Sequence, residues 1–176
     1  GLLALNARAW HGAPIRLWPL ALGSEAALAE LISSPINSAD NRLWRPQPEL
    51  AASGGDPERW RRQPALIMPL DIVRGEVSLD LLFLDAQGWE PDILRGAQRT
   101  IARARPLLVL EWWPRALAAR GLDPYDELDW IEGQLGVRLF VADDLAREAL
   151  GVRHATEQLL DDQDGAAHVE LVGLPG

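Results

Sequence analysis

The stretch LLFLDAQGWEPDILRGAQRTI, residues 81–101, decides the fold class of this chain. A continuous apolar run ends at Asp85, and a helical pattern begins at Pro91, a residue that suits the first turn of a helix. A short apolar run bounded by polar residues is typical of a strand covered on both faces, as in a parallel sheet. The stretch therefore predicts a buried strand over residues 79–85 that ends in a carboxylate and leads into a helix.

The predicted helix and the strand after it extend this pattern. One helical face is apolar and consists of Ile93, Leu94, Ala97, Ile101 and Ala104. Gly96 lowers the helix propensity by about 1 kcal/mol, so we expect it where the helix packs closely on the sheet. Pro106 ends the helix, and residues 106–113 form a second apolar run with a carboxylate near its end, Glu111.

The rest of the second half continues the alternation of helices and strands. Asp123 and Pro124 are typical of an N-cap and a first helical turn, and Gly136 closes that helix. The further elements that the pattern predicts are a strand at 137–143, a short helix at 144–151 and a strand at 168–174. Such alternation favours an open α/β sheet. Ligands bind such sheets beyond the carboxyl ends of the strands, which makes Asp85 and Glu111 candidate site residues.

The first half of the chain is less regular. Residues 2–9 resemble the end of a helix, and the extended segments that the sequence predicts are 15–23, 27–34 and 66–73. Residues 35–65 are rich in proline and glycine and predict a long loop, a feature that is usually functional or disordered. We treat residues 1–176 as a single domain.

Composition narrows the class of protein. The net charge of −9 disfavours binding to nucleic acid or to an anionic membrane, and the one tight basic group, Arg59, Arg61 and Arg62, is interpreted as a solvated loop. The chain has no cysteine and no lysine, which excludes disulfides, Schiff-base chemistry and a lysine-dependent phosphate loop. No apolar run approaches the roughly 20 residues that span a bilayer. We therefore expect a cytoplasmic protein without nucleic-acid or membrane partners.

Residues 84–114 resemble the signature of the FkbM-family methyltransferases. That signature has an Asp-x-Glu/Gln-Gly-x-Glu run, a Val/Ile-Leu-x-Gly-Ala helix, an Arg-Pro pair and a strand that ends in Glu. The matching residues here are Asp85, Gln87, Gly88 and Glu90, then Ile93 to Ala97, Arg105 with Pro106, and Glu111. Weaker matches upstream are Leu70 with Asp71, the run from Pro19 to Gly23, and Asn6.

The resemblance implies a Rossmann-like class I methyltransferase sheet that binds S-adenosylmethionine. It implies transfer of a methyl group to a hydroxyl of a sugar, a polyketide or another small metabolite. The family's glycine-rich loop and the acidic residue after its second strand are not found in the sequence. The resemblance therefore also implies a C-terminal portion of that sheet, without its first two strands.

The resemblance assigns roles to particular residues. Asp85 is the expected catalytic residue, either as general base toward the acceptor hydroxyl or as the charge that orients the methionine ammonium. The other residues expected at the cofactor are Leu22, Gly23, Gln87 and Gly88, and those expected at the acceptor are Trp89, Glu90, Glu111 and Trp112.

Structural roles compete with each of these assignments. Asp85 could cap its own turn, Glu90 could cap the following helix, and Glu111 could pair with Arg115. The tryptophans could belong to the core. The three histidines have no metal-ligand spacing, and we expect no metal site.

Two further classes of function stay open. A non-catalytic or decayed α/β module could bind a glycan or a protein partner, and the missing cofactor motifs favour it. Another α/β enzyme, such as one that acts on nucleotide sugars, is the third alternative, because the segment that would separate the classes is not found.

Overall fold

The computed structural model describes residues 12, 14–33, 41–44, 61–73, 78–142, 149–162 and 167–176 of the chain. Within them, the strands form two separate four-stranded sheets, and helices alternate with strands in the second half. The fold is therefore mixed α/β, as the sequence predicts. The helix end predicted for residues 2–9, and Asn6 within it, lie outside the described residues.

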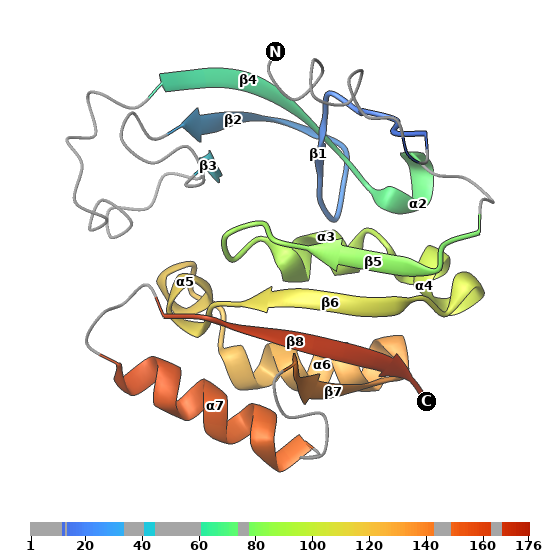
Figure 1. Cartoon of the computed structure of the whole chain (residues 1–176). Helices are drawn as coiled ribbons and strands as arrows, with labels where there is room; N and C mark the ends of the chain where they lie inside the picture. The colour runs from blue at the N-terminus through green and yellow to red at the C-terminus, as the bar shows by residue number, and fades with distance from the viewer. Residues whose placement is uncertain are drawn as a thin grey trace.

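The sheet that carries the signature residues has the strand order β5–β6–β8–β7. Its strands are β5 (Leu81–Leu84), β6 (Leu107–Trp112), β7 (Val137–Val141) and β8 (Val169–Pro175). β5 and β6 are parallel, whereas β8 is antiparallel to both of its neighbours. The carboxyl ends of β5, β6 and β7 and the amino end of β8 therefore meet at one edge of the sheet (Figure 1).

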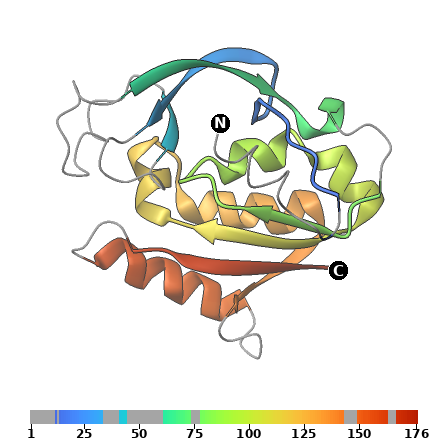
Figure 2. The ribbon, with the colours of Figure 1, turned by 45° about the horizontal axis from the view of Figure 1, so that its top comes forward.

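Helices follow each strand of this sheet except β8. They are α3 (Glu90–Arg95), α4 (Gln98–Ala104), α5 (Pro114–Ala119), α6 (Pro124–Leu135) and α7 (Ala149–Asp161). Figures 1 and 2 show α3, α4 and α6 on one face of the sheet. The core forms between that face and the helices, and its fully buried members include Leu94, Leu108, Leu110, Ile131 and Leu171.

Local sequence signals set the bounds of α6 as predicted. The side chain of Asp123 accepts hydrogen bonds from the backbone N–H groups of Tyr125 and Asp126, at 2.8 and 3.3 Å. These bonds satisfy amides that have no partner within the helix. Gly136 ends the helix in the left-handed conformation, with φ 62°.

The other sheet has the strand order β1–β4–β2–β3. Its strands are β1 (Ala21–Leu22), β2 (Ala27–Ser33), β3 (Asn41–Trp44) and β4 (Arg61–Met68). β2 lies between β3 and β4 and is antiparallel to both, while β1 is parallel to β4. Figure 1 shows this sheet beyond β5, on the side of β5 that faces away from β6.

A capping contact joins the two halves of the molecule. β4 leads into the short helix α2 (Leu70–Val73), and the Asp71 carboxylate accepts hydrogen bonds from the backbone N–H groups of Thr100 and Arg99, at 2.8 and 3.1 Å. α4 has no cap of its own, because its N-cap residue is Ala97. Burial acts to raise the pKa of Asp71, but the hydrogen bonds from Thr100 and Arg99 together lower it below its usual value.

Strand pairing corrects several predictions for the first half. The strand predicted at 15–23 is reduced to β1, and the extended segment predicted at 66–73 divides into the end of β4 and α2. The loop predicted at 35–65 contains β3 and the start of β4. β3 and β4 form because each pairs with one edge of β2. This tertiary pairing outweighs the unfavourable strand propensity of the proline and glycine residues in the segment.

The prediction that the strand at 79–85 is covered on both faces is also wrong. Leu82 and Leu84 are buried, but Leu81 and Phe83 point to the other face and are 49% and 57% exposed. Among the described strands β5 pairs only with β6, so it forms an edge of its sheet.

The single helix predicted after Pro91 is interrupted. α3 ends at Arg95 and α4 begins at Gln98. A Cβ on Gly96 would lie 2.0 Å from the carbonyl oxygen of Gly23, so only glycine allows the two backbones to approach. The close packing predicted for Gly96 is confirmed. Downstream, the prediction of a helix at 144–151 is off in its bounds: the described helix α7 starts at Ala149 and continues to Asp161, and residues 144–148 lie outside the described residues.

Candidate functional site

The residues after β5 form a tight turn before α3. Gln87 has φ 56° and Gly88 has φ 84°, both in the left-handed region. A Cβ on Gly88 would also lie 2.7 Å from the Cβ of Ala116 in α5. A side chain at position 88 would therefore be strained by the positive φ and would clash with Ala116, so glycine is required. The turn predicted at Gln87 and Gly88 is confirmed. The Asp85 side chain remains exposed at the edge of the sheet.

Gln87 connects the carboxylates of two adjacent strands. Its side-chain Nε2 donates to Asp85 Oδ1 at 3.1 Å and lies 3.2 and 3.1 Å from the two carboxylate oxygens of Glu111. Its backbone N–H donates to Glu111 Oε2 at 3.3 Å. The two acids that the sequence places at strand ends are thus brought together, with an amide between them.

Glu111 is the buried member of this pair, with 8% of its surface exposed. Burial raises the pKa of Glu111, and the charge of the Asp85 carboxylate raises it further. His168 opposes this effect, since its Nε2 lies 3.7 Å from Glu111 Oε1. A carboxyl group with a raised pKa beside an exposed carboxylate can hold or accept a proton.

The side chain of Glu90 holds the turn through a hydrogen bond. It is 1% exposed, and its Oε1 accepts a hydrogen bond from the backbone N–H of Ala86 at 2.6 Å. Burial raises the pKa of Glu90 to about 7, and the nearby charges of Glu111 and Asp85 add to the effect, against the hydrogen bonds from the backbone amides of Glu90 and Ala86. At this depth Glu90 is not open to an acceptor in this conformation.

Trp89 and Arg120 brace the other side of the turn. The indole Nε1 of Trp89 donates to the carbonyl of Leu22 at 3.1 Å, and the guanidinium of Arg120 lies 4.4 Å from the centre of the Trp89 ring. Arg120 also donates to the carbonyl of Gly88 and forms an ion pair with Asp92. This set of contacts anchors the turn both to β1 and to the end of α5.

The two tryptophans predicted at the acceptor, Trp89 and Trp112, are buried, and their role at the acceptor stays a prediction. Trp89 is 7% exposed, and Trp112 is 1% exposed with its Nε1 donating to Thr156 Oγ1 at 3.0 Å. Both indoles belong to the core, so neither is open to an acceptor in this conformation. The alternative ion pair of Glu111 with Arg115 is not what the structure forms, because Arg115 donates to the carbonyl of Leu160 instead.

Leu22 and Gly23 lie beside the turn through Trp89. The carbonyl of Leu22 accepts from that indole, while the N–H of Gly23 donates to the carbonyl of Met68 at 3.2 Å. Their assignment to the cofactor stays a prediction. The predicted site does not include His168, because the histidines have no metal-ligand spacing. The position of His168 directly before the last strand could have indicated its role: β8 is antiparallel to β6, so the start of β8 lies beside the end of β6.

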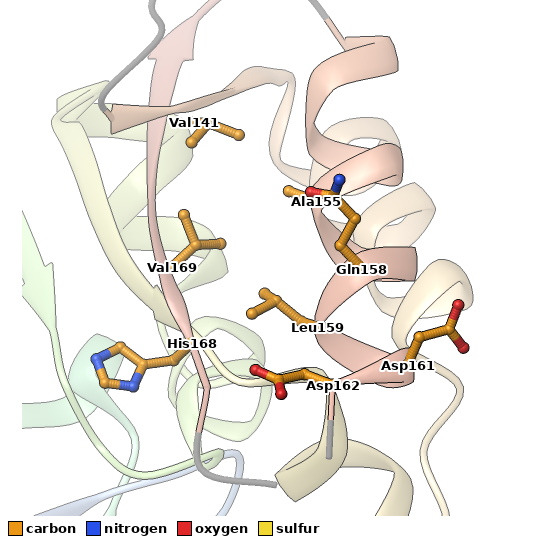
Figure 3. Close-up of a pocket in the computed structure, with 8 residues that line it drawn as sticks. All are labelled: Val141, Ala155, Gln158, Leu159, Asp161, Asp162, His168 and Val169. Atoms are coloured by element: carbon orange, nitrogen blue, oxygen red, sulfur yellow. The ribbon is translucent and has the colours of Figure 1, made fainter. Parts of the chain in front are cut away.

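A pocket of about 710 Å³ opens at the same edge of the sheet, between α7 and the ends of β7 and β8 (Figure 3). Its apolar wall includes Leu159 and Val169, and its polar residues are Gln158, Asp161, Asp162 and His168. Figure 3 shows that the His168 ring points away from the side of β8 that carries Val169. His168 therefore lies between the pocket and Glu111.

The model of the FkbM methyltransferase domain matches residues 19–134, which is well over half of the chain. The chain belongs to the FkbM methyltransferase family. The match covers β5, β6 and the whole turn between β5 and α3, so both Asp85 and Glu111 lie within the family domain. Neither the search of curated proteins nor the search of solved structures found a match.

Two further observations concern this FkbM-family chain. None of its described helices is long and apolar enough to cross a membrane. Across the described ranges, no group of three His, Asp or Glu side chains is arranged to hold a metal ion.

Proposed function

We propose that this FkbM-family protein is an S-adenosylmethionine-dependent O-methyltransferase that acts on a hydroxyl of a small metabolite, such as a sugar or a polyketide. The observation that carries the proposal is the exposed Asp85 carboxylate, which is linked through Gln87 to the buried Glu111 at the carboxyl ends of two parallel strands. Ligands of open α/β sheets bind at such ends.

The residues around Asp85 fit one end of the donor. Gly88 lets the backbone of the turn come close to a ligand. The hydrogen bond from Trp89 holds Leu22 and Gly23 beside the turn, which supports their inclusion in the donor site. When bound, S-adenosylmethionine supplies an electrophilic methyl group.

The acid pair meets the chemical need of the acceptor. A hydroxyl is a weak nucleophile at neutral pH, so the oxygen that forms the new O–CH₃ bond must lose its proton. Asp85 takes this proton as general base, and Glu111 stabilises the arrangement through Gln87. The donor would supply the methyl group and leave as S-adenosylhomocysteine, and the proton of the acceptor hydroxyl would remain on the carboxyl pair.

The strand pattern supports a Rossmann-like class I organisation. The parallel β5–β6 pair followed by antiparallel β8, with helices between successive strands, agrees with that sheet. We propose that both sheets of the chain derive from this organisation.

The test uses the protein with S-adenosylmethionine labelled in its methyl group and a panel of hydroxylated acceptors. We expect transfer of label to an acceptor, and at least a tenfold loss of turnover in Asp85→Asn at unchanged stability, because the general base is removed. Unchanged turnover in this variant would overturn the role of Asp85. Calorimetry with S-adenosylhomocysteine measures cofactor binding separately from turnover.

A non-catalytic binding module is the second candidate. The observation that favours it is the pocket, whose apolar wall lies on the opposite side of β8 from the His168 ring and hence from Glu111. Binding of a glycan by a protein that shows no affinity for S-adenosylhomocysteine would favour this alternative.

A further inference from the structure

Glu90 is a buried carboxylate with almost no surface open to solvent. It is 1% exposed at the first residue of α3, and its hydrogen bond to Ala86 spans the whole turn. Fully buried acids are rare unless they are paired with a cation. The contacts that surround Glu90 are instead backbone amides and two further acids. Such a group requires an explanation other than packing.

The hydrogen bond to Ala86 acts directly on the acid pair. Ala86 lies between Asp85 and Gln87, so the Glu90 carboxylate fixes the peptide that orients both neighbours. Gln87 bridges Asp85 and Glu111 while in a left-handed conformation, with φ 56°. A non-glycine residue holds this conformation only where its surroundings impose it.

We propose that Glu90 is a positioning residue that sets the geometry of the Asp85–Glu111 pair, and that its protonation state is coupled to the state of that pair. The structural part stands on the contacts alone. The consequence for turnover rests on the proposed methyl transfer.

The charges around Glu90 define the direction of the coupling. Asp85 and Glu111 face it from the ends of β5 and β6, and His168 faces Glu111 from the start of β8. On the α5 side, Arg120 is engaged by Asp92 and by the Gly88 carbonyl. Ionisation of Glu90 therefore adds a negative charge beside two acids, which raises their affinity for a proton. A pKa of about 7 puts this change within the neutral range.

The first test measures the turn itself. Amide NMR shifts of Ala86 and Gln87 are followed from pH 5.5 to 8.5 in the full chain and in Glu90→Gln, which keeps the shape and an acceptor oxygen but cannot ionise. We expect the Ala86 amide, which donates to Glu90, to show an inflection near pH 7 in the unmodified protein and to lose it in the variant, whereas the Gln87 amide also reports on Glu111. Absence of the inflection in the unmodified protein overturns the inference, whether or not the variant folds.

Glu127→Gln is the matched control. Glu127 is also buried, at 5% exposure, but it pairs with Arg95, at the opposite end of α3 from Glu90. The Ala86 inflection must persist in this variant. Its disappearance there would show that the amide reports a general change of the fold and would overturn the coupling to Glu90.

The second test separates this inference from the proposed function. Turnover of the unmodified protein should change by about tenfold between pH 6 and 8, as one titrating group with a pKa near 7 requires. Glu90→Gln should flatten this pH profile. The affinity of the variant for S-adenosylhomocysteine should stay within about twofold of that of the unmodified protein. If the unmodified protein neither binds S-adenosylhomocysteine nor turns over, the proposed function fails, and the NMR result still decides the role of Glu90. A bound, active protein with the same pH profile in both forms overturns the coupling.

Discussion

Strand β5 and the turn that follows it are adjacent in the sequence but are held in opposite ways. The turn is enclosed by Glu90, Trp89 and Arg120. Its backbone groups bond to side chains of α3 and of the α5 end, and the Trp89 side chain bonds to the backbone of β1. The strand pairs on one edge and leaves Leu81 and Phe83 exposed. The site is therefore held by contacts with helices and a distant strand, and not by deep burial of its own strand.

The largest expected effect comes from the close approach that aligns β1 with α3. Gly96→Ala should lower the free energy of unfolding by about 3 kcal/mol or more, because the new Cβ would meet the backbone of Gly23, which cannot move away as a side chain would. Gly133→Ala in α6 is the control, because a Cβ there meets nothing within 4 Å. It should stabilise the protein by up to about 1 kcal/mol. Chemical denaturation measures both, and equal effects would contradict the assignment.

The two faces of β5 should respond unequally to truncation. Leu84→Ala should cost about 3 kcal/mol, since Leu84 is 5% exposed. Phe83→Ser, at the neighbouring position, should change stability by less than about 0.5 kcal/mol. We also expect the exposed apolar face of Leu81 and Phe83 to favour self-association, which this substitution should reduce. Denaturation and sedimentation at several concentrations measure these effects. A large loss of stability in Phe83→Ser would show that this face is covered in solution.

The pH dependence of stability sharpens the role of Glu90. Its pKa in the folded protein is raised from 4.5 to about 7, so the folded state binds more protons than the unfolded state between these values. The stabilising contribution is complete below pH 4.5 and is lost as the pH rises through 7, by about 3 kcal/mol at most. Unfolding experiments at pH 5 and pH 8 should show this loss in the unmodified protein but not in Glu90→Gln. A parallel pH dependence in both proteins would contradict the burial of an ionisable Glu90.

The smallest expected effect concerns the cap between the two halves. Asp71→Ala should cost about 1 kcal/mol at pH 7, because α4 loses the acceptor of its first amides. The pKa of Asp71 is lowered, so its contribution is present above the unfolded value and is lost as the pH falls through the folded value. The difference between variant and unmodified protein should therefore shrink in acid. A difference that is constant from pH 7 to pH 2 would contradict the capping role.

The sequence by itself determined the strand, turn and helix around Asp85, the cap at Asp123, the closing glycine at Gly136 and the family of the chain. These features depend on dihedral preferences and hydrogen bonds within a few residues, and such preferences can be read locally. The placement of Asp85 and Glu111 at one edge followed from the rule for parallel strands.

Only the tertiary structure decided the break between α3 and α4, the open face of β5, the burial of Glu90 and the approach of His168 to Glu111. Each depends on segments far apart in the chain: Gly96 meets Gly23, Glu90 is covered by the packed core, and His168 reaches Glu111 because β8 reverses direction. Local sequence patterns indicate the conformation that a residue prefers. Whether the residue adopts it depends on contacts with distant segments, and these contacts exist only once the chain has folded.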